Sequence, residues 1–444
     1  MSPTPPSAPA PIPTPMPLPP GPVTDGVPVW RGADAAAWSA AGPGRWARPL
    51  WSVLGLLVAV GAAITVEPIA ACTDAHPCGP DWLGLVQTGL AIGLLHWNAR
   101  LPELALVAAP ALAVVVAVEQ FPAPGTESLV ANLAVLAALG LGWAAACARL
   151  TARRRQRLLF ERTAGAVMRP FGPKGLPRRG TGPLAAGLVL CAVAIAVTFT
   201  CLRDIQAEED RAARATRTEA EVTGRTEWAL RLRTHDGRRL TVDSVFPEDQ
   251  RTGTTITVLE DGSWRRLAAE PYDPVGREVL VLVTGTIGIS LTGTGLLAFR
   301  RSLARRLRGL PALLAVRVLM ATDAEGTTRV HASDDTDLRT PLFVAVWAPY
   351  LLTDEEHERQ DETEDETEDE IGGEGEDEWE DTDPDFTLVS LRESVMFGVP
   401  HEGAELAFVT STAEGSPHTA VVLTTVRVPW TARRVSGRGR PATG

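Results

Sequence analysis

Six apolar stretches, separated by polar loops, dominate the pattern of hydrophobic and polar positions along this chain. Each stretch is about 16 to 22 residues long, close to the roughly 20 residues with which an α-helix crosses a hydrocarbon core. The pattern therefore predicts an α-helical membrane bundle of six transmembrane helices. The stretches cover residues 50–71, 82–97, 101–118, 129–148, 184–202 and 279–299, and residues 45–150 hold the first four.

Small residues recur at a spacing of four within several of these stretches. One row is Thr284, Gly288 and Thr292, and another begins at Gly55. Small side chains allow two helix backbones to approach closely in lipid, where no hydrophobic force drives the helices together. The rows predict a closely packed bundle.

Between the fifth and sixth helices, residues 203–278 change to short alternating segments typical of β-strands. Two hairpin signals, Asp236-Gly237 and Asp261-Gly262, each lie between such segments. Asp-Gly flanked by alternating residues is a strong signal for a tight β-hairpin turn. We expect a small β-barrel or meander, preceded by a charged run, 203–217, that continues the fifth helix into solvent.

Alternation with period two returns after the sixth helix, in residues 300–352 and 386–430, which we interpret as one β-rich domain. Residues 353–385 interrupt it, and within them residues 354–385 hold 20 acidic residues and one arginine. Like charges at that density cannot be buried, so this insertion is predicted to be disordered and dispensable for folding. Loose Ca²⁺ binding or competition with lipid for the basic loops is one interpretation, but a tolerated loop expansion is favoured.

Both ends of the chain are expected to lack a fixed fold. Residues 1–28 contain twelve prolines. Proline fixes φ and lacks an N–H group, which disfavours helix and sheet and leaves extended polyproline II structure. We predict a disordered, Pro-rich tail over residues 1–44 and a second disordered tail over residues 431–444.

The basic residues fall on alternate sides of the predicted helices. Arginines gather before the first helix, in the loop 151–182 and directly after the sixth helix, whereas the loops 72–81 and 119–128 contain neither Lys nor Arg. The positive-inside rule then places both termini and the second β-rich domain in the cytoplasm. At about 75 residues, segment 203–278 is long enough to be translocated despite its arginines, so its β domain is predicted to be extracytoplasmic.

The net charge of −12 averages over opposed blocks, because the chain without residues 354–385 carries a net charge of +7. The expected partner is the lipid bilayer, with anionic lipid at the basic inner loops. Lys174 is the only lysine, while Ala, Arg, Gly and Pro abound. Such usage is typical of GC-rich coding and indicates a bacterial, specifically actinobacterial, plasma membrane.

Five cysteines are too few for a disulfide scaffold. Cys72 and Cys78 share the first predicted outer loop, and a local disulfide on that oxidising side is the favoured interpretation. Asp74 and His76 between them are also ligand types for zinc or copper. Two free thiols are the third alternative.

Chemistry-bearing residues are scarce. Glu67, about one turn inside the outer surface, is the best candidate for a functional carboxylate in the helices, although a side chain that reaches the headgroups is favoured. The segment from His331 to Asp337 gathers metal-ligand types, but its spacing fits no EF-hand and a polar turn explains it better. Zinc-helix, nucleophile-elbow and phosphate-loop motifs do not occur. We expect no catalytic residue, no metal, no cofactor and, given the few aromatics, no nucleic-acid partner.

The region 183–300 resembles actinobacterial multi-pass membrane proteins of unknown function that carry a compact β domain between two helices. The resemblance rests on the hairpin Asp236-Gly237-Arg238 and on a late strand that runs from Gly253 to Val258. It implies architecture and no activity.

These observations favour a non-catalytic, multi-pass plasma-membrane protein that acts as an envelope sensor, scaffold or assembly factor. A small-solute transporter or permease is the alternative, weakened by helices that carry few polar groups. A membrane-embedded enzyme ranks third, because the sequence offers no set of nucleophile, base or metal ligands.

Overall fold

The computed structural model describes residues 15–18, 24–66, 81–119, 121, 125–165, 168–170, 180–245, 247–302, 312–323, 327–347, 388–410 and 424–427. Its contacts divide the chain into two compact units. The helical unit comprises Gly44–Ala148 and Gly180–Leu296, and the barrel unit comprises Met1–Pro43, Arg149–Arg179 and Leu297–Gly444.

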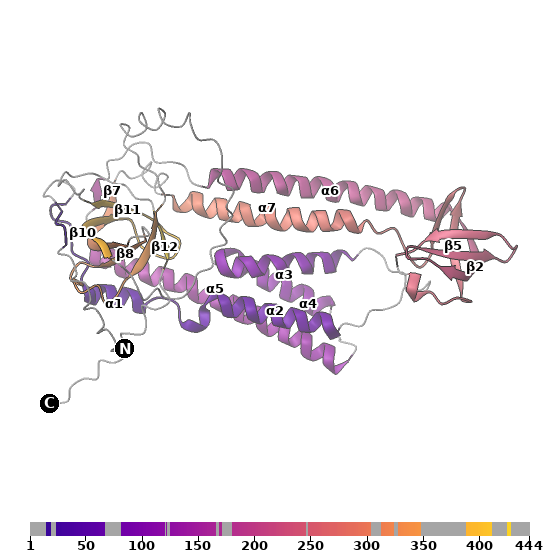
Figure 1. Cartoon of the computed structure of the whole chain (residues 1–444), viewed down its shortest axis with the longest axis horizontal. Helices are drawn as coiled ribbons and strands as arrows, with labels where there is room; N and C mark the ends of the chain where they lie inside the picture. The colour runs from indigo at the N-terminus through magenta and orange to yellow at the C-terminus, as the bar shows by residue number, and fades with distance from the viewer. Residues whose placement is uncertain are drawn as a thin grey trace, which may run out of the picture. The chain divides into compact units, whose positions relative to one another are not determined.

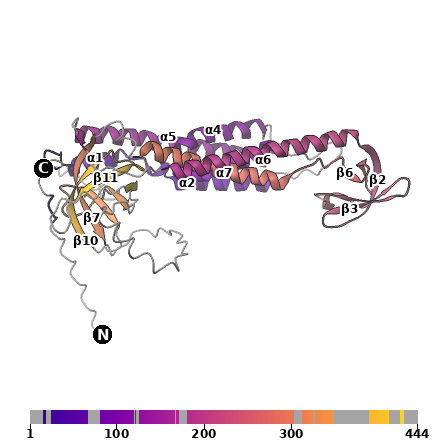
Figure 2. The ribbon, with the colours of Figure 1, turned by 90° about the horizontal axis from the view of Figure 1, so that it is seen from above.

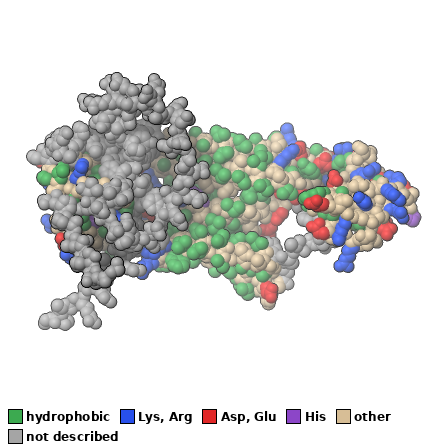
Figure 3. Space-filling view, viewed as in Figure 1, with side chains coloured by type: hydrophobic (Ala, Val, Ile, Leu, Met, Phe, Trp, Pro, Cys, Tyr) green, Lys and Arg blue, Asp and Glu red, His purple; other side chains and the backbone are tan. Residues whose placement is uncertain are grey.

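Five helices are long and apolar enough to cross a membrane, and they coincide with five of the six predicted spans. They are α2 (Pro49–Val66), α4 (Pro102–Glu119), α5 (Thr126–Ala164), α6 (Thr181–Arg214) and α7 (Val275–Arg301). Large apolar side chains on them are exposed, such as Val107 at 72% and Ile195 at 71%, and Figure 3 shows this hydrophobic cover in green. Soluble proteins rarely expose so much apolar surface, so these helices indicate a membrane protein.

The remaining predicted span forms α3 (Trp82–Arg100), a helix of 19 residues. Its Gln87, His96, Asn98 and Arg100 make it less apolar than the other five, and it is not among the candidates for crossing. Its crossing therefore stays a prediction.

Two helices are longer than the apolar stretches that predicted them. α5 has 39 residues and continues to Ala164, so the first half of the predicted basic loop 151–182 is helical. α6 has 34 residues and reaches Arg214, which agrees with the prediction that the charged run extends the fifth helix. At 1.5 Å per residue, α5 measures about 58 Å, nearly twice the thickness of a hydrocarbon core.

α6 and α7 lie side by side in both ribbon views (Figures 1 and 2) and pack through glycines. A Cβ atom on Gly187 would lie 2.8 Å from the Gly288 carbonyl oxygen, and one on Gly295 would lie 2.8 Å from the Gly180 carbonyl oxygen. The backbones therefore approach closely at Gly288, as its row of small residues predicted. Gly55, in another predicted row, faces open space in the described part of the chain.

α3 runs along α7 in the same chain direction. A Cβ atom on Gly89 would lie 2.9 Å from Leu282 Cδ1, and two turns further along Trp97 Nε1 donates a hydrogen bond of 2.9 Å to Ser290 Oγ. From the first contact to the second, the residue number increases along both helices. The two helices are therefore parallel.

A five-stranded antiparallel sheet links α6 to α7 (Figure 2). Its strands are β2 (Thr216–Arg225), β3 (Ala229–Thr234), β4 (Arg239–Asp243), β5 (Thr255–Asp261) and β6 (Trp264–Leu267), in the order β4-β3-β2-β5-β6. Both predicted hairpins are present, with Gly237 and Gly262 at positive φ. The outermost strands β4 and β6 also touch, so the sheet is nearly closed around a core that includes Val222, Leu230 and Val258.

The barrel unit contains a closed ring of six antiparallel strands. β7 (Ala312–Asp323), β10 (Leu388–Phe397), β11 (Glu405–Thr410), β12 (Thr424–Arg427), β9 (Phe343–Trp347) and β8 (Thr328–Ala332) pair in this order, and β8 pairs back to β7. β1 (Met168–Pro170) adds to one end of β7. Strands before and after the acidic insertion are thus neighbours in one sheet. The insertion 353–385 and the tail 431–444 lie outside the described residues.

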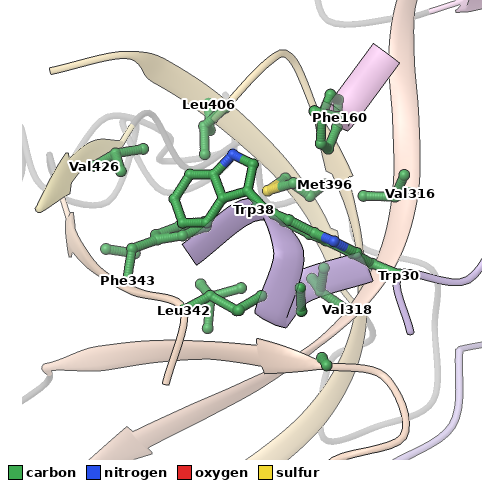
Figure 4. Packing of buried hydrophobic residues seen from close by; sticks show 14 of the residues in the cluster. Trp30, Trp38, Phe160, Val316, Val318, Leu342, Phe343, Met396, Leu406 and Val426 are labelled. Carbon is green, nitrogen blue, oxygen red and sulfur yellow. The ribbon is translucent and has the colours of Figure 1, made fainter. Parts of the chain in front are cut away.

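The N-terminal segment contributes to the core of this barrel. Trp30 and Trp38, at either end of α1 (Gly32–Ala40), are each 1% exposed, and Figure 4 shows them among Phe160, Phe343 and strand residues. The ring centroids of Trp30 and Phe160 are 5.4 Å apart. The prediction of a disordered tail over 1–44 is therefore wrong for residues 24–43, because burial of two tryptophans outweighs the local bias of the prolines.

Upstream of α1, the same segment occupies open edges of the sheet. Met16 exchanges backbone hydrogen bonds of 3.0 Å with Leu391 and Glu393 of β10, and Trp30 N–H donates to the Arg317 carbonyl of β7 at 3.0 Å. These bonds satisfy backbone N–H and C=O groups of β10 and β7 at positions beyond the ends of their neighbours β11 and β8. The N-terminal segment thereby protects the strand edges. Two 3₁₀ turns, Arg45–Ala47 and Pro247–Asp249, complete the described elements.

Candidate functional site

Charged and aromatic side chains gather where α6 and α7 join the five-stranded sheet. We call this region the junction. It comprises Asp204, Glu208 and Arg211 of α6, Asp261, Trp264 and Arg266 of the β5–β6 hairpin, and Asp273, Arg277 and Glu278 around the start of α7.

The last turns of α6 bind the β5–β6 hairpin. Trp264 Nε1 donates a hydrogen bond of 3.1 Å to Glu208 Oε2, and Arg211 Nε lies 3.3 Å from Asp261 Oδ2. The guanidinium groups of Arg211 and Arg266 lie 5.3 and 5.5 Å from the centroid of the Trp264 ring, within cation–π range. Burial lowers the pKa of Arg266, against the opposing effect of Glu208.

Chain connectivity explains why the helix meets this hairpin. A single residue, Ala215, separates α6 from β2, and the first residue of β2, Thr216, pairs with Glu260 near the end of β5. The β5–β6 turn therefore lies beside the last turns of α6. The domain is attached to the helix both by the chain and by side-chain contacts.

Two carboxylates of the junction have buried oxygen atoms without a hydrogen-bond partner. They are Oδ1 of Asp273, in the link that follows β6, and Oε1 of Glu278, in the first turn of α7. Glu278 is 8% exposed, and burial raises the pKa of Asp273. The neighbouring Arg277 forms an ion pair with Asp204 instead.

Further negative charge lies close to this pair of carboxylates. Glu278 interacts electrostatically with Asp273 and with Asp81, whose side chain caps α3 by accepting the Gly84 N–H at 2.8 Å. The buried thiol of Cys201 on α6 also interacts electrostatically with Glu278 and Asp273. Buried carboxylates without donors are costly unless a proton or a cation neutralises them.

One ion pair joins α6 to the β5–β6 hairpin, and another joins α6 to α7. Within the described ranges, no three His, Cys, Asp or Glu side chains come together as a metal-binding group. Besides one oxygen each of Asp273 and Glu278, Nε and Nη1 of Arg266 are buried without a hydrogen-bond partner among the described residues. The hydrogen bond and the ion pairs attach the five-stranded domain to α6 and join α6 to α7.

The site residues singled out from the sequence are Glu67, Cys72 and Cys78. All three lie outside the described residues, so the functional carboxylate and the disulfide stay predictions. Asp273 and Glu278 were missed because they precede the sixth apolar stretch and look like ordinary loop residues. The one available signal was a glutamate directly before the sixth apolar stretch, which is too common to be specific.

Buried amides inside the helical unit were also missed. Asn98 of α3 is 6% exposed and Asn132 of α5 is 7% exposed. A Cβ atom on Gly142 of α5 would lie 3.3 Å from Asn98 Oδ1, so the amide fits against a glycine of the neighbouring helix. Amides of this kind join helices in lipid.

The His331 segment in the barrel unit forms a polar turn, as its spacing predicted. Asp335 accepts the Arg339 and Thr340 N–H groups at 3.1 and 3.0 Å and lies 3.2 Å from His331 Nδ1, while Asp334 accepts the Gly32 N–H at 2.6 Å. Burial lowers the pKa of His331, partly offset by Asp335. Burial would raise the pKa of Asp335, but its hydrogen bonds lower it. These bonds fix the turn and the start of α1.

Comparison with protein-family models, with curated proteins and with solved structures finds no match to this chain.

Proposed function

We propose that the protein is a non-catalytic, multi-pass protein of a bacterial plasma membrane that acts as an envelope sensor or scaffold. One observation carries this proposal. α6 continues without a break from its apolar part to Arg214 and binds the hairpin of the domain that it leads into, through Glu208, Arg211 and Trp264. A force or ligand acting on the five-stranded domain would therefore move α6 and, through the glycine contacts, α7.

Contacts within the barrel unit support an even number of membrane crossings by the helices α2 to α5. Trp38, before α2, and Phe160, at the end of α5, share one hydrophobic core. Residues of one core lie on one side of a membrane, so the four helices α2 to α5 must cross an even number of times. Because α2, α4 and α5 qualify as spans, this parity supports a crossing by α3 as well, and six crossings in total.

The packing of α3 against α7 supports the same count. The two helices are parallel, with contacts at Gly89–Leu282 and at Trp97–Ser290. Six crossings that start inside give α3 and α7 the same direction, from outside to inside. With 19 residues, α3 is about 28 Å long, close to the roughly 30 Å of a hydrocarbon core.

The orientation follows from the arginines of the sequence. We propose that the barrel unit and both termini are cytoplasmic and that the five-stranded domain is extracytoplasmic. The exposed Arg154, Arg155 and Arg300 then contact anionic lipid near the inner leaflet.

Substitutions at the junction test the coupling between domain and helix. We expect Glu208→Gln combined with Arg211→Gln to loosen the hairpin from α6 and to speed amide hydrogen exchange in residues 203–214 at least tenfold. Loss of two partly exposed polar contacts explains this magnitude. The matched control, Glu219→Gln with Arg217→Gln, changes exposed side chains on β2. Equal exchange in 203–214 for both pairs of substitutions would show that the domain is not coupled to α6.

A small-solute transporter is a second candidate, favoured by the buried amides Asn98 and Asn132. Transport would require these amides to line a path rather than to join helices. Uptake that falls in Asn98→Leu, with folding preserved, would favour the transporter over the sensor.

A further inference from the structure

We propose that Asp273 and Glu278 form a binding site for a divalent metal cation, of the class of Ca²⁺ or Mg²⁺, beside the five-stranded domain. The inference deepens the proposed function and rests on it in one respect, namely that this side of the membrane is extracytoplasmic. There, the cation would be the signal that the domain reports.

One oxygen atom of each carboxylate lacks a hydrogen-bond partner among the described residues. Glu278 is more than nine-tenths buried, yet its Oε1 atom accepts no hydrogen bond from the described residues. Asp273 is half-buried, but its Oδ1 atom also lacks a hydrogen-bond partner among the described residues, and Glu278 interacts electrostatically with it. A buried carboxylate beside a second carboxylate is strongly unfavourable unless a proton or a cation neutralises the pair.

Two arginines of the junction are paired elsewhere, and the third, Arg266, lies over the Trp264 ring with Nε and Nη1 buried without a hydrogen-bond partner among the described residues. Arg277 pairs with Asp204, and Arg211 pairs with Asp261. Asp81 at the start of α3 adds negative charge instead of balancing it. The local charge therefore favours a cation from solution.

The ligand type at this position favours an alkaline-earth cation. Carboxylate oxygens are the ligands of hard cations, whereas zinc prefers nitrogen and sulfur. Two carboxylates suffice when water completes the coordination sphere, as is usual for Mg²⁺. Few protein ligands imply a weak site, with a Kd of roughly 10⁻⁴ to 10⁻³ M, as in extracellular Ca²⁺ modules.

The position of the site gives the cation a structural effect. Asp273 belongs to the link between β6 and α7, and Glu278 belongs to the first turn of α7. A cation held by both carboxylates ties the link to the helix. The domain is then fixed to α7 by the ion and to α6 by the Trp264 contacts, so occupancy stiffens the junction.

Thermal unfolding of the full-length protein in detergent tests the site. The midpoint is followed by tryptophan fluorescence while CaCl₂ or MgCl₂ is raised to about 10 mM and KCl keeps the ionic strength constant. We expect the midpoint to rise by about 2 to 5 °C, because a ligand that binds only the folded state stabilises it. Asp273→Asn and Glu278→Gln should each abolish the rise, and the exposed control Glu219→Gln should keep it.

Binding of Mn²⁺, followed by the loss of its free electron paramagnetic resonance signal, gives a second readout that does not depend on stability. The protein and the Glu219→Gln control should bind about one Mn²⁺ per chain in the millimolar range, and Asp273→Asn should bind at least fivefold more weakly. Equal binding by control and variant would overturn the site. A midpoint that Glu278→Gln raises while cations have no effect would also overturn it, because protons then neutralise the pair. Neither result affects hydrogen exchange in residues 203–214, so failure of the site is separable from failure of the proposed function.

Discussion

Replacing Gly187 by leucine is expected to separate α6 from α7 and to remove most folded protein from the membrane. A Cβ atom at this position would lie 2.8 Å from the Gly288 carbonyl oxygen and closer still to the Thr292 amide nitrogen. Both are backbone atoms, so a change of side-chain rotamer cannot relieve the clash. Overpacking typically costs about 1 to 3 kcal/mol, and a rigid backbone contact between helices places leucine at or above that range. Gly187→Ala should already lower the unfolding midpoint.

Gly140→Ala is the matched control, because this glycine also lies in an apolar helix but faces open space. Alanine favours a helix over glycine by about 1 kcal/mol, so this control should be neutral or slightly stabilising. The measurement is the thermal unfolding midpoint and the monodisperse fraction of each purified variant in detergent. If Gly187→Ala matches Gly140→Ala, the close approach of α6 and α7 is not needed for stability.

Replacing Trp38 by alanine should destabilise the barrel unit by about 3 to 5 kcal/mol, the usual cost of deleting a large aromatic side chain from a core. Trp38 is 1% exposed and packs against Trp30 and Phe343, with ring centroids 5.7 and 6.3 Å away (Figure 4). The loss would be measured as protease susceptibility of the barrel unit in increasing urea, with the full-length protein in detergent.

Trp38→Phe separates packing from hydrogen bonding. The indole N–H of Trp38 is buried without a partner among the described residues, so phenylalanine loses no hydrogen bond and should cost only about 1 kcal/mol. Trp228→Ala removes a tryptophan that is 69% exposed and should change stability by about 0.5 kcal/mol or less. A barrel unit that tolerates Trp38→Ala as well as Trp228→Ala would refute a structural role for the N-terminal segment.

The helices were predictable because apolar length is a strong and local signal. Five of the six stretches became helices that can cross a membrane, and the two Asp-Gly turns in residues 203–278 became hairpins at Gly237 and Gly262. Each of these predictions depends on neighbouring residues alone. The ends of α5 and α6 were harder to predict, because arginine and glutamate are compatible with a helix as well as with a loop.

The assembly of the barrel was not predictable from local pattern. α1 joins a core whose strands begin near residue 312, and Met16 pairs with residues near 392. The proline content suggested a solvated tail. The fold of this segment is instead determined by two tryptophans, whose packing partners lie far along the chain. Such contacts depend on tertiary burial, which neither periodicity nor composition reveals.

The junction carboxylates were missed for a related reason. Asp273 and Glu278 are unremarkable in the sequence, and only the fold shows that one oxygen of each is buried without a donor among the described residues. Glu67, chosen because it lies in an apolar stretch, falls outside the described residues and stays a candidate. Sequence position indicates which carboxylates are near the membrane, whereas the surroundings decide which of them need a cation.

Six crossings, with the two β domains on opposite faces, are the central claim, and cysteine accessibility in intact cells tests it most directly. Single cysteines would replace the exposed residues Thr241 on β4, Thr336 in the barrel unit and Ala36 on α1, in a chain whose Cys72 and Cys78 are serine. A membrane-impermeant thiol reagent should label Thr241→Cys in intact cells, and Thr336→Cys and Ala36→Cys only after the membrane is opened. Labelling of Ala36→Cys but not of Thr336→Cys in intact cells would place the two residues on opposite sides of the membrane and contradict an even number of crossings. Protection of Thr241→Cys would contradict the orientation.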